Sequence, residues 1–123
     1  RLSINYQYLT LASVLICIVF ACHWTACIWA LQASFDPLGS WMGATGYCTK
    51  TTDGIECEGT YEMYSFSLYF AVMTITTVGY GEPAASAFNP AEQLICSFLM
   101  LASGMLWGYL VGVFCMLASP SPS

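Results

Sequence analysis

Two long apolar stretches without formal charge constrain the fold of this chain more than any other feature. They span 8–31 and 94–117. Each exceeds the roughly 20 residues of helix that cross the hydrocarbon core of a bilayer. The whole chain is 58% hydrophobic and 7% charged, whereas soluble domains carry about 25% charged residues. The sequence therefore predicts an all-α membrane protein with two transmembrane helices, one over 8–31 and one over 91–118.

The second helix has a clear start and a distinctive face. Asn89 suits the N-cap, Pro90 the first helical position, and Glu92 the position of a capping-box partner. Small residues on one helix face permit close packing against another helix. They can equally form a flexible point at which a helix bends, and the sequence leaves both interpretations open. The residues concerned recur every four positions: Gly104, Gly108 and Gly112.

The first helix contains His23, and a histidine inside a membrane span usually faces protein. A proton or metal site is one interpretation. The only candidate ligand one turn away is Cys27. A structural hydrogen bond to a neighbouring helix is therefore the better interpretation of His23. We expect Cys17, Cys22 and Cys27 to be packing residues, because their spacing of five rotates them around the helix.

Residues 35–60, which we call the turret, are rich in glycine, threonine and acids, which predicts loops and turns. All seven acidic residues of the chain lie between the two apolar stretches, where Lys50 is the only base. Such a surface concentrates cations and repels anions, so nucleic acid is not an expected partner. If the turret is extracellular, Cys48 and Cys57 are candidates for a disulfide, although two free thiols remain an alternative.

The segment that follows carries the most informative motif, Thr-x-x-Thr-x-Gly-Tyr-Gly, which is the signature of potassium channels. Its matching residues are Thr74, Thr77, Gly79, Tyr80 and Gly81. In such filters, backbone carbonyls replace the hydration shell of K⁺, and residues 77–81 resemble them in their Thr-Val-Gly-Tyr-Gly sequence. The alternative is a glycine-containing turn after a β-branched strand.

Each filter residue, 77–81, has a physical role in this interpretation. Aiming successive carbonyls at one axis requires backbone angles that Gly79 and Gly81 adopt without a Cβ penalty. The hydroxyl of Thr77 adds a ligand below the carbonyls of Thr77, Val78, Gly79 and Tyr80. We expect Val78 and Tyr80 to point away from the axis and to pack behind the filter. One chain supplies one wall, so the site needs four copies. K⁺ is the only ion expected, with no organic cofactor.

A short helix is predicted over 61–76, with Thr60 as its N-cap. Its length of about 24 Å is too short to cross a membrane and return, so we expect a re-entrant pore helix enclosed by protein. Its C-terminal end, near Thr74 and Thr76, would direct a negative dipole towards a cation. Glu82 directly follows the filter, where a ring of acids would raise the local cation concentration, although a solvated loop charge is the alternative.

The pattern His-Trp-x-Ala-Cys-x-Trp in the first helix resembles the fifth transmembrane segment of the ether-à-go-go branch of voltage-gated potassium channels. The superfamily of that branch has cytoplasmic cyclic-nucleotide-binding-type domains and includes plant inward rectifiers. The resemblance implies a tetramer of this chain with three further subunits in a lipid bilayer. It also implies a plasma-membrane channel with cytoplasmic ends, an extracellular turret, an upstream voltage sensor and a downstream cytoplasmic domain. By the same resemblance Trp107 and Val111 would face the cavity below the filter. Val111 departs from the aromatic residue often found there.

The expected function is therefore passive, K⁺-selective conduction, voltage-gated in the full-length protein. The chain starts at Arg1, and we expect it to be a fragment of a longer protein. A weakly selective pacemaker-type channel is the nearest alternative, but such channels typically have Cys in place of Thr77. A potassium transporter subunit with degraded filters and a non-conducting regulatory or scaffold subunit are further alternatives. No nucleophile–base pair or phosphate loop suggests an enzyme.

Overall fold

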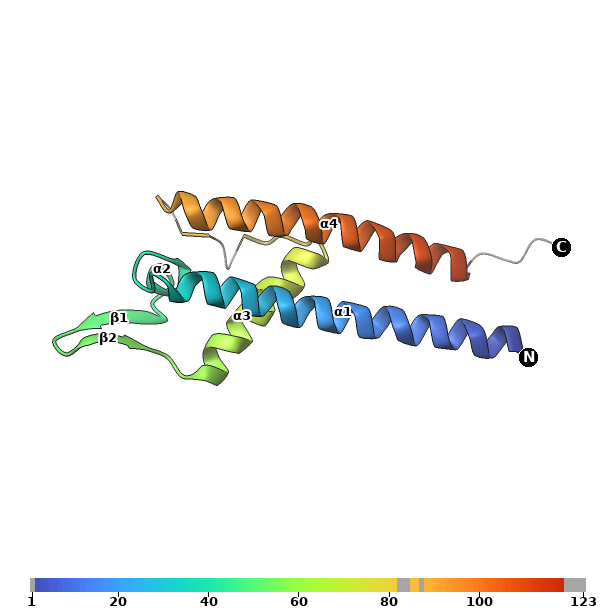
Figure 1. Ribbon diagram of the computed structural model, residues 1–123, viewed down its shortest axis with the longest axis horizontal. Helices are drawn as coiled ribbons and strands as arrows, with labels where there is room; N and C mark the ends of the chain where they lie inside the picture. Colours follow the sequence, from blue (N-terminus) through green and yellow to red (C-terminus); the bar gives the residue numbers. More distant parts are fainter. Residues whose placement is uncertain (1, 82–84, 87, 119–123) are drawn as a thin grey trace.

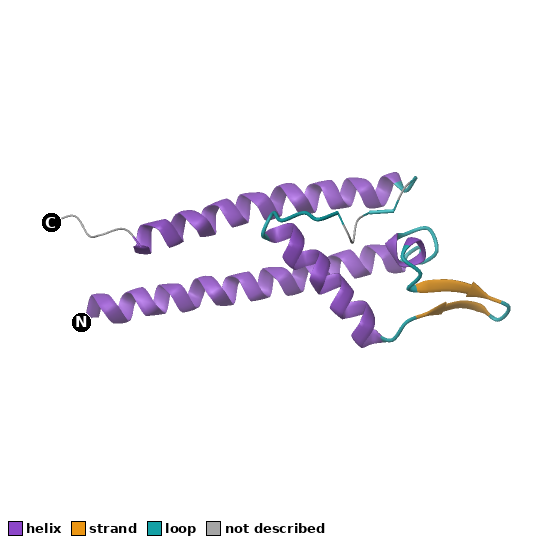
Figure 2. Cartoon of the chain, turned by 180° about the vertical axis from the view of Figure 1, so that it is seen from behind, coloured by secondary structure: helices purple, strands orange, loops and turns teal. Residues whose placement is uncertain are grey.

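The structure, a computed structural model, describes residues 2–81, 85–86 and 88–118. Two long helices, α1 (Leu2–Ser34) and α4 (Pro90–Ala118), lie side by side and antiparallel (Figure 1). A shorter helix, α3 (Thr60–Ile75), crosses α1 obliquely and ends against α4. The start of α1 and the end of α4 lie at the same end of the molecule, as the opposite view in Figure 2 also shows.

The two long helices predicted from hydropathy are present. Within α1 the apolar span covers Tyr6–Ser34, and the second span covers all of α4. Their apolar side chains are largely exposed in the single chain, among them Leu15, Phe20 and Leu101. Such a surface is stable against lipid rather than water. The chain is a membrane protein.

The turret contains regular structure that the sequence analysis did not predict. It holds a short helix, α2 (Trp41–Ala44), and a hairpin of β1 (Cys48–Thr51) and β2 (Gly54–Cys57). The strands are antiparallel, with Thr51 opposite Gly54. Asp53-Gly54 at the turn is a recognised hairpin signal. Gly54 has a φ of 131°, which is why glycine suits this end of the turn.

Buried aromatic rings join the turret to the helices. Trp29 of α1 stacks on Phe70 of α3 with ring centroids 4.1 Å apart, and Trp41 of α2 lies parallel to Trp29 at 6.3 Å. The indole Nε1 of Trp41 donates a hydrogen bond to the Trp29 carbonyl. All three rings are buried. This cluster fixes α2, and the part of α3 around Phe70, against α1. A second cluster, of Cys22, Ala26, Ala71 and Ile75, joins α1 to the end of α3.

The helix starts differ in part from the sequence-based expectation. The structure has Gly59 rather than Thr60 at the N-cap of α3, without a side-chain cap, so that prediction was wrong. At the start of α4, the side-chain oxygen of Asn89 accepts a hydrogen bond from the Glu92 amide, as expected of an N-cap. Glu92 is not a capping-box partner, because its carboxylate binds Gln32, Trp41 and Ser86 instead.

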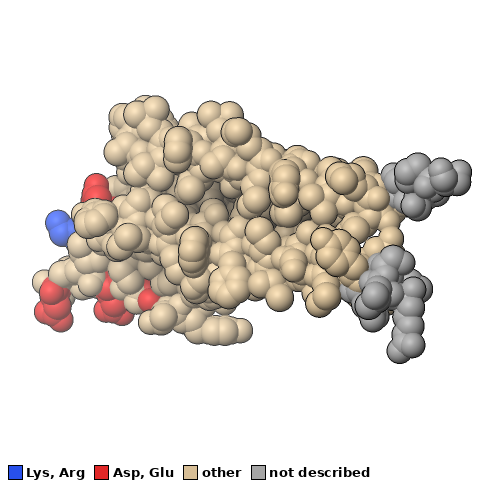
Figure 3. Space-filling model, turned by 45° about the vertical axis from the view of Figure 1, so that its right-hand side comes forward, with Lys and Arg blue, Asp and Glu red and all other residues tan. Residues whose placement is uncertain are grey.

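Charged side chains gather at the end of the molecule that carries the turret, and the rest of the visible described face is uncharged (Figure 3). Glu92 is an exception to the expected acidic surface, since only 1% of it is exposed. It therefore cannot act as an exposed mouth charge.

Candidate functional site

The predicted filter, residues 77–81, leaves the C-terminal end of α3 through a tight, hydrogen-bonded turn, and we keep the name filter for this segment. The side chain of Thr76 donates to the Val72 carbonyl at 2.7 Å. The amide of Thr77 donates to the Thr74 carbonyl at 3.2 Å, and that of Gly79 to the Met73 carbonyl at 3.3 Å. These bonds satisfy carbonyls that the helix end leaves unpaired. They fix the first residues of the filter relative to α3.

The backbone of the filter alternates in handedness. Thr77, Gly79 and Gly81 have φ values of 62°, 61° and 93°. Val78 and Tyr80 lie between them and are not among the described residues with positive φ. In an ordinary extended strand, successive carbonyls point to opposite sides, as the side chains do. Alternation in the sign of φ is the change needed to turn them towards one side.

The positive φ of Thr77 was not predicted, because the sequence indicated roles for its hydroxyl and its carbonyl but no unusual backbone angle. A left-handed backbone is unusual for a β-branched residue. The Thr77 hydroxyl donates to the Thr76 carbonyl at 2.6 Å. No side-chain pattern indicates this conformation in advance.

Little of the chain packs behind the filter. Tyr80 is 78% exposed and Val78 is 52% exposed. A hollow of about 590 Å³ lies between the filter, α3 and α4, and its lining includes Phe70, Met73, Thr74, Gln93, Cys96 and Met100. The described residues of one chain therefore do not make the packing expected behind Tyr80. Glu82, the expected pore-mouth acid, lies outside the described residues.

The candidate cavity and gate residues lie along α4, which is a continuous helix through its three glycines. A Cβ added at Gly104, Gly108 or Gly112 would meet no atom within 4 Å. The close packing that small residues permit is therefore not made there within one chain. Trp107 is half-buried against the Cys22 and Ile75 cluster, and Val111 is exposed.

Histidine 23 makes the structural contact that the sequence favoured. Nδ1 of His23 lies 2.6 Å from the hydroxyl oxygen of Tyr64 on α3. Its Nε2 lies 3.6 Å from the sulfur of Cys27. Among the described residues, no group of three or more His, Cys, Asp or Glu side chains could hold a metal ion. His23 thus links α1 to α3.

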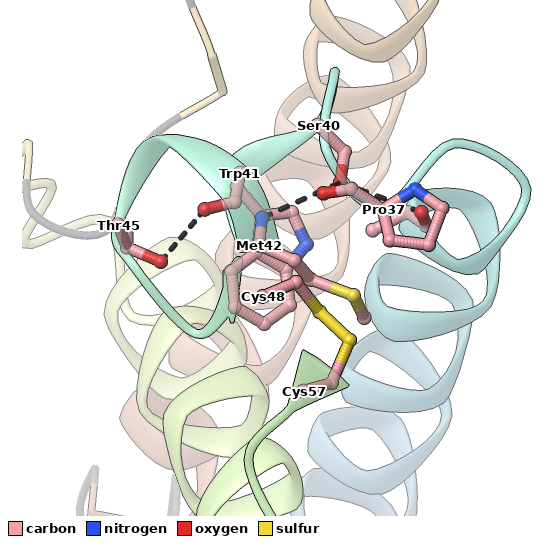
Figure 4. The surroundings of a disulfide bond; sticks show 8 residues. Pro37, Ser40, Trp41, Met42, Thr45, Cys48 and Cys57 are labelled. Carbon is pink, nitrogen blue, oxygen red and sulfur yellow. Dashed lines mark hydrogen bonds between the residues drawn. A yellow bond between two sulfur atoms is a disulfide. The ribbon is translucent and has the colours of Figure 1, made fainter. Parts of the chain in front are cut away.

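A disulfide closes the base of the turret hairpin (Figure 4). Cys48 and Cys57 face each other at the open end of the β1–β2 ladder. Cys48 is buried beside Trp41 and Met42, in the cluster formed around Trp29. The Ser40 hydroxyl accepts a hydrogen bond from the Met42 amide and donates one to the Pro37 carbonyl. Ser40 thereby caps the start of α2. The bridge therefore ties the hairpin to the buried base of the turret.

Comparison with known proteins places this geometry in context. Residues 8–119 match a family described as "Ion channel". Potassium channel AKT1 of Arabidopsis thaliana is 32% identical over 110 residues, which cover 88% of this chain and 12% of that protein. Potassium channel KAT2 of the same plant is also 32% identical, over 15% of its length. Potassium channel GORK is 27% identical over 113 residues, or 14% of its length. The chain thus spans less than a sixth of each of these relatives. No solved structure gives a significant match.

Proposed function

This chain belongs to the ion-channel family, and on that premise we propose that it forms one quarter of a K⁺-selective pore. The observation that carries the proposal is the alternating handedness of Thr77–Gly81, with positive φ at Thr77, Gly79 and Gly81. A chain that aims successive carbonyls at one axis can replace the water shell of K⁺ with oxygens. Relatives named as potassium channels support the choice of ion.

Four copies would complete the site, as a homotetramer or with three related subunits. A single chain supplies carbonyls from one side only, and a dehydrated cation needs oxygens all around it. The exposure of Val78 and Tyr80, and the hollow behind them, fit a filter whose support comes partly from neighbouring copies. In that assembly α3 would be a re-entrant pore helix enclosed by protein.

The remaining site residues have supporting roles in this proposal. Thr74 and Thr76 hold the end of the pore helix beneath the filter, and Glu82 contributes to an acidic ring at the mouth. The inner helix is α4, and its residues that line the cavity or bend to open it are Gly104, Trp107, Gly108, Val111 and Gly112.

The proposed setting is the plasma membrane, with the turret outside and both chain ends in the cytoplasm. The apolar surfaces of α1 and α4 would face lipid, and the charged turret would attract cations from solution. A voltage sensor before this region and a cytoplasmic domain after it would control opening. Conduction is passive and needs neither an organic cofactor nor nucleic acid.

A reversal potential tests the proposal, measured with K⁺ inside and Na⁺ outside on the full-length protein that contains this chain. We expect a value close to the K⁺ equilibrium potential. A value near zero would favour a weakly selective, pacemaker-type channel. An absence of current from protein shown to be at the cell surface, under depolarising and hyperpolarising steps alike, would favour a non-conducting regulatory subunit.

A further inference from the structure

Glu92, at the start of α4, is a buried acid that joins three other parts of the chain. Its Oε1 accepts a hydrogen bond from the Ser86 amide at 2.8 Å. Its Oε2 accepts one from Gln32 Nε2 of α1 at 2.7 Å and one from the Trp41 amide of α2 at 3.2 Å. Buried carboxylates are retained where hydrogen bonds compensate for lost hydration. Three hydrogen-bond donors compensate the Glu92 carboxylate in this way.

Ser86, the partner that follows the filter, is held through every polar group it has. Its amide binds Glu92, its hydroxyl donates to the Gly39 carbonyl at 3.0 Å, and its own carbonyl accepts from Gln93 Nε2 at 3.1 Å. Asn89 also donates to the Gly39 carbonyl, at 2.8 Å. Ser86 is therefore a fixed point shortly after Gly81, at the boundary of turret and α4.

The filter needs such a fixed point because its backbone is unfavourable by itself. Its entry is held by the amides of Thr77 and Gly79, which bond to the end of α3. Ser86 follows Gly81, the last filter residue, five positions later in the sequence. A segment with left-handed φ, including one at a β-branched threonine, persists only when its surroundings over-determine it.

We propose that Glu92 is a positioning residue for K⁺ conduction, which anchors the outer end of the filter through the Ser86 amide and keeps the filter conducting during sustained opening. This inference rests on the proposed function. Its rival is a purely structural role, in which Glu92 only joins α4 to α1 through Gln32.

Glu92→Gln tests the inference with almost no change in shape. A carboxylate presents two acceptor oxygens, whereas an amide presents one, and its NH₂ group would face an N–H donor. Losing a hydrogen bond to a charged group shifts an equilibrium by roughly ten- to a hundredfold. We expect the ratio of conducting to non-conducting filters to fall by about that factor.

The measurement is the decay of K⁺ current in the full-length protein during maintained opening, together with the K⁺/Na⁺ permeability ratio. The Glu92→Gln current should decay at least about tenfold faster than wild type. Raised external K⁺ should slow the decay, because an ion that binds the conducting form stabilises it. Glu62→Gln is the matched control, since it removes an exposed acid from the first turn of α3 and should behave as wild type. A steady current with unchanged selectivity in both Glu92→Gln and the Ser86 ester variant described next would overturn the inference.

Two further changes separate anchoring from helix joining. An ester in place of the Ser86 peptide amide, introduced with the α-hydroxy acid analogue, removes only the N–H that Glu92 accepts, and it should reproduce the fast decay. Gln32→Leu removes the donor from α1 to Glu92, together with the bond of Gln32 to the Trp29 carbonyl on the same helix, and should leave the decay unchanged. The reverse pattern would reject the positioning role. The ester variant alone decides if Glu92→Gln does not reach the membrane.

These outcomes are distinguishable from failure of the proposed function. A wild-type channel that does not prefer K⁺ rejects the proposed function. A K⁺-selective channel whose current stays steady in both the Glu92→Gln and ester variants rejects only the role of Glu92.

Discussion

Three left-handed φ angles set the energetic cost of the filter segment at the scale of single residues. An L-residue in this conformation costs roughly 1–2 kcal/mol, because its Cβ approaches the following carbonyl oxygen. Gly79 and Gly81 avoid that cost, whereas Thr77 bears it. The cost is intrinsic to the backbone. A Cβ added at Gly79 or Gly81 would meet no other atom within 4 Å in the single chain.

Gly79→Ala should therefore abolish selective K⁺ current. The substitution adds about 1–2 kcal/mol of strain to a segment that already carries one strained threonine. Whole-cell current and the K⁺/Na⁺ permeability ratio measure the result. Normal selective current from this variant would contradict the filter assignment.

Gly46→Ala is its matched control. Gly46 has a φ of 86° in the turret, and a Cβ there would also meet no atom within 4 Å. The variant carries a similar backbone penalty away from the filter, so its permeability ratio should equal that of wild type.

At the scale of elements, α3 depends on α1 for its position. Three small side chains, of Cys22, Ala26 and Ala71, bring the two helices together in the cluster that also contains Ile75. The contact of His23 with Tyr64 adds a polar link on the same pair of helices. Because the filter begins where α3 ends, the tilt of α3 against α1 sets where the filter lies.

Tyr64→Phe and His23→Leu should show energetic coupling. Both changes remove the same hydrogen bond, so the double variant should lose less stability than the two single variants together, by about 0.5–1.5 kcal/mol. Thermal unfolding of the purified full-length protein in detergent would provide the values. Tyr69→Phe, on an exposed position of the same helix, is the control and should not couple to His23. Strictly additive losses would show that the contact contributes nothing.

Reduction of the Cys48–Cys57 bridge should loosen the hairpin and leave selectivity intact. A bridge of this kind contributes typically about 2–4 kcal/mol by restricting the unfolded chain. It closes the turret hairpin, whereas the first residues of the proposed filter are bonded to the end of α3. Faster hydrogen exchange in 48–57 under reducing agent, with an unchanged reversal potential, is the expected result. Loss of K⁺ preference on reduction would show that the turret and filter are not independent.

Most of what could be predicted for these elements came from hydropathy and from the Thr-x-x-Thr-x-Gly-Tyr-Gly motif. The two spans and the short helix before the filter were evident from apolar length and from the position of Gly79 and Gly81. The β1–β2 hairpin was missed although Asp53-Gly54 marked its turn, because the glycine-rich turret was interpreted wholly as loop. The burial of Glu92 could not be predicted. Two of its three partners are backbone amides, of Trp41 and Ser86, and amides leave no trace in a side-chain pattern.

Across the whole molecule, charge is separated from apolar surface. The described charged residues gather at the turret end, and the visible remainder of the surface is uncharged (Figure 3). Hydrocarbon excludes charge, so the turret end of the molecule lies in water rather than in the membrane core. Four acidic turrets around one mouth would concentrate cations there, by an effect that salt screens.

Neutralising the exposed turret acids Glu56 and Glu58 with glutamine should lower single-channel K⁺ conductance at low ionic strength. The difference should vanish near 1 M salt, where the Debye length is about 3 Å. Lys50→Gln changes charge in the opposite sense on the same hairpin and should raise the conductance at low salt. If the glutamine variant keeps its deficit at high salt, the acids act through structure rather than through the field.

The antiparallel arrangement of α1 and α4 has a consequence for protein architecture. The chain enters and leaves the unit at the same end (Figure 1). In the proposed topology the chain crosses the membrane twice, which would put a segment joined after α4 on the same side of the membrane as a segment joined before α1. Such a unit can therefore be joined to other protein segments at either end. It can be repeated in tandem within one polypeptide, or spliced behind a different sensor, without inverting any neighbouring module.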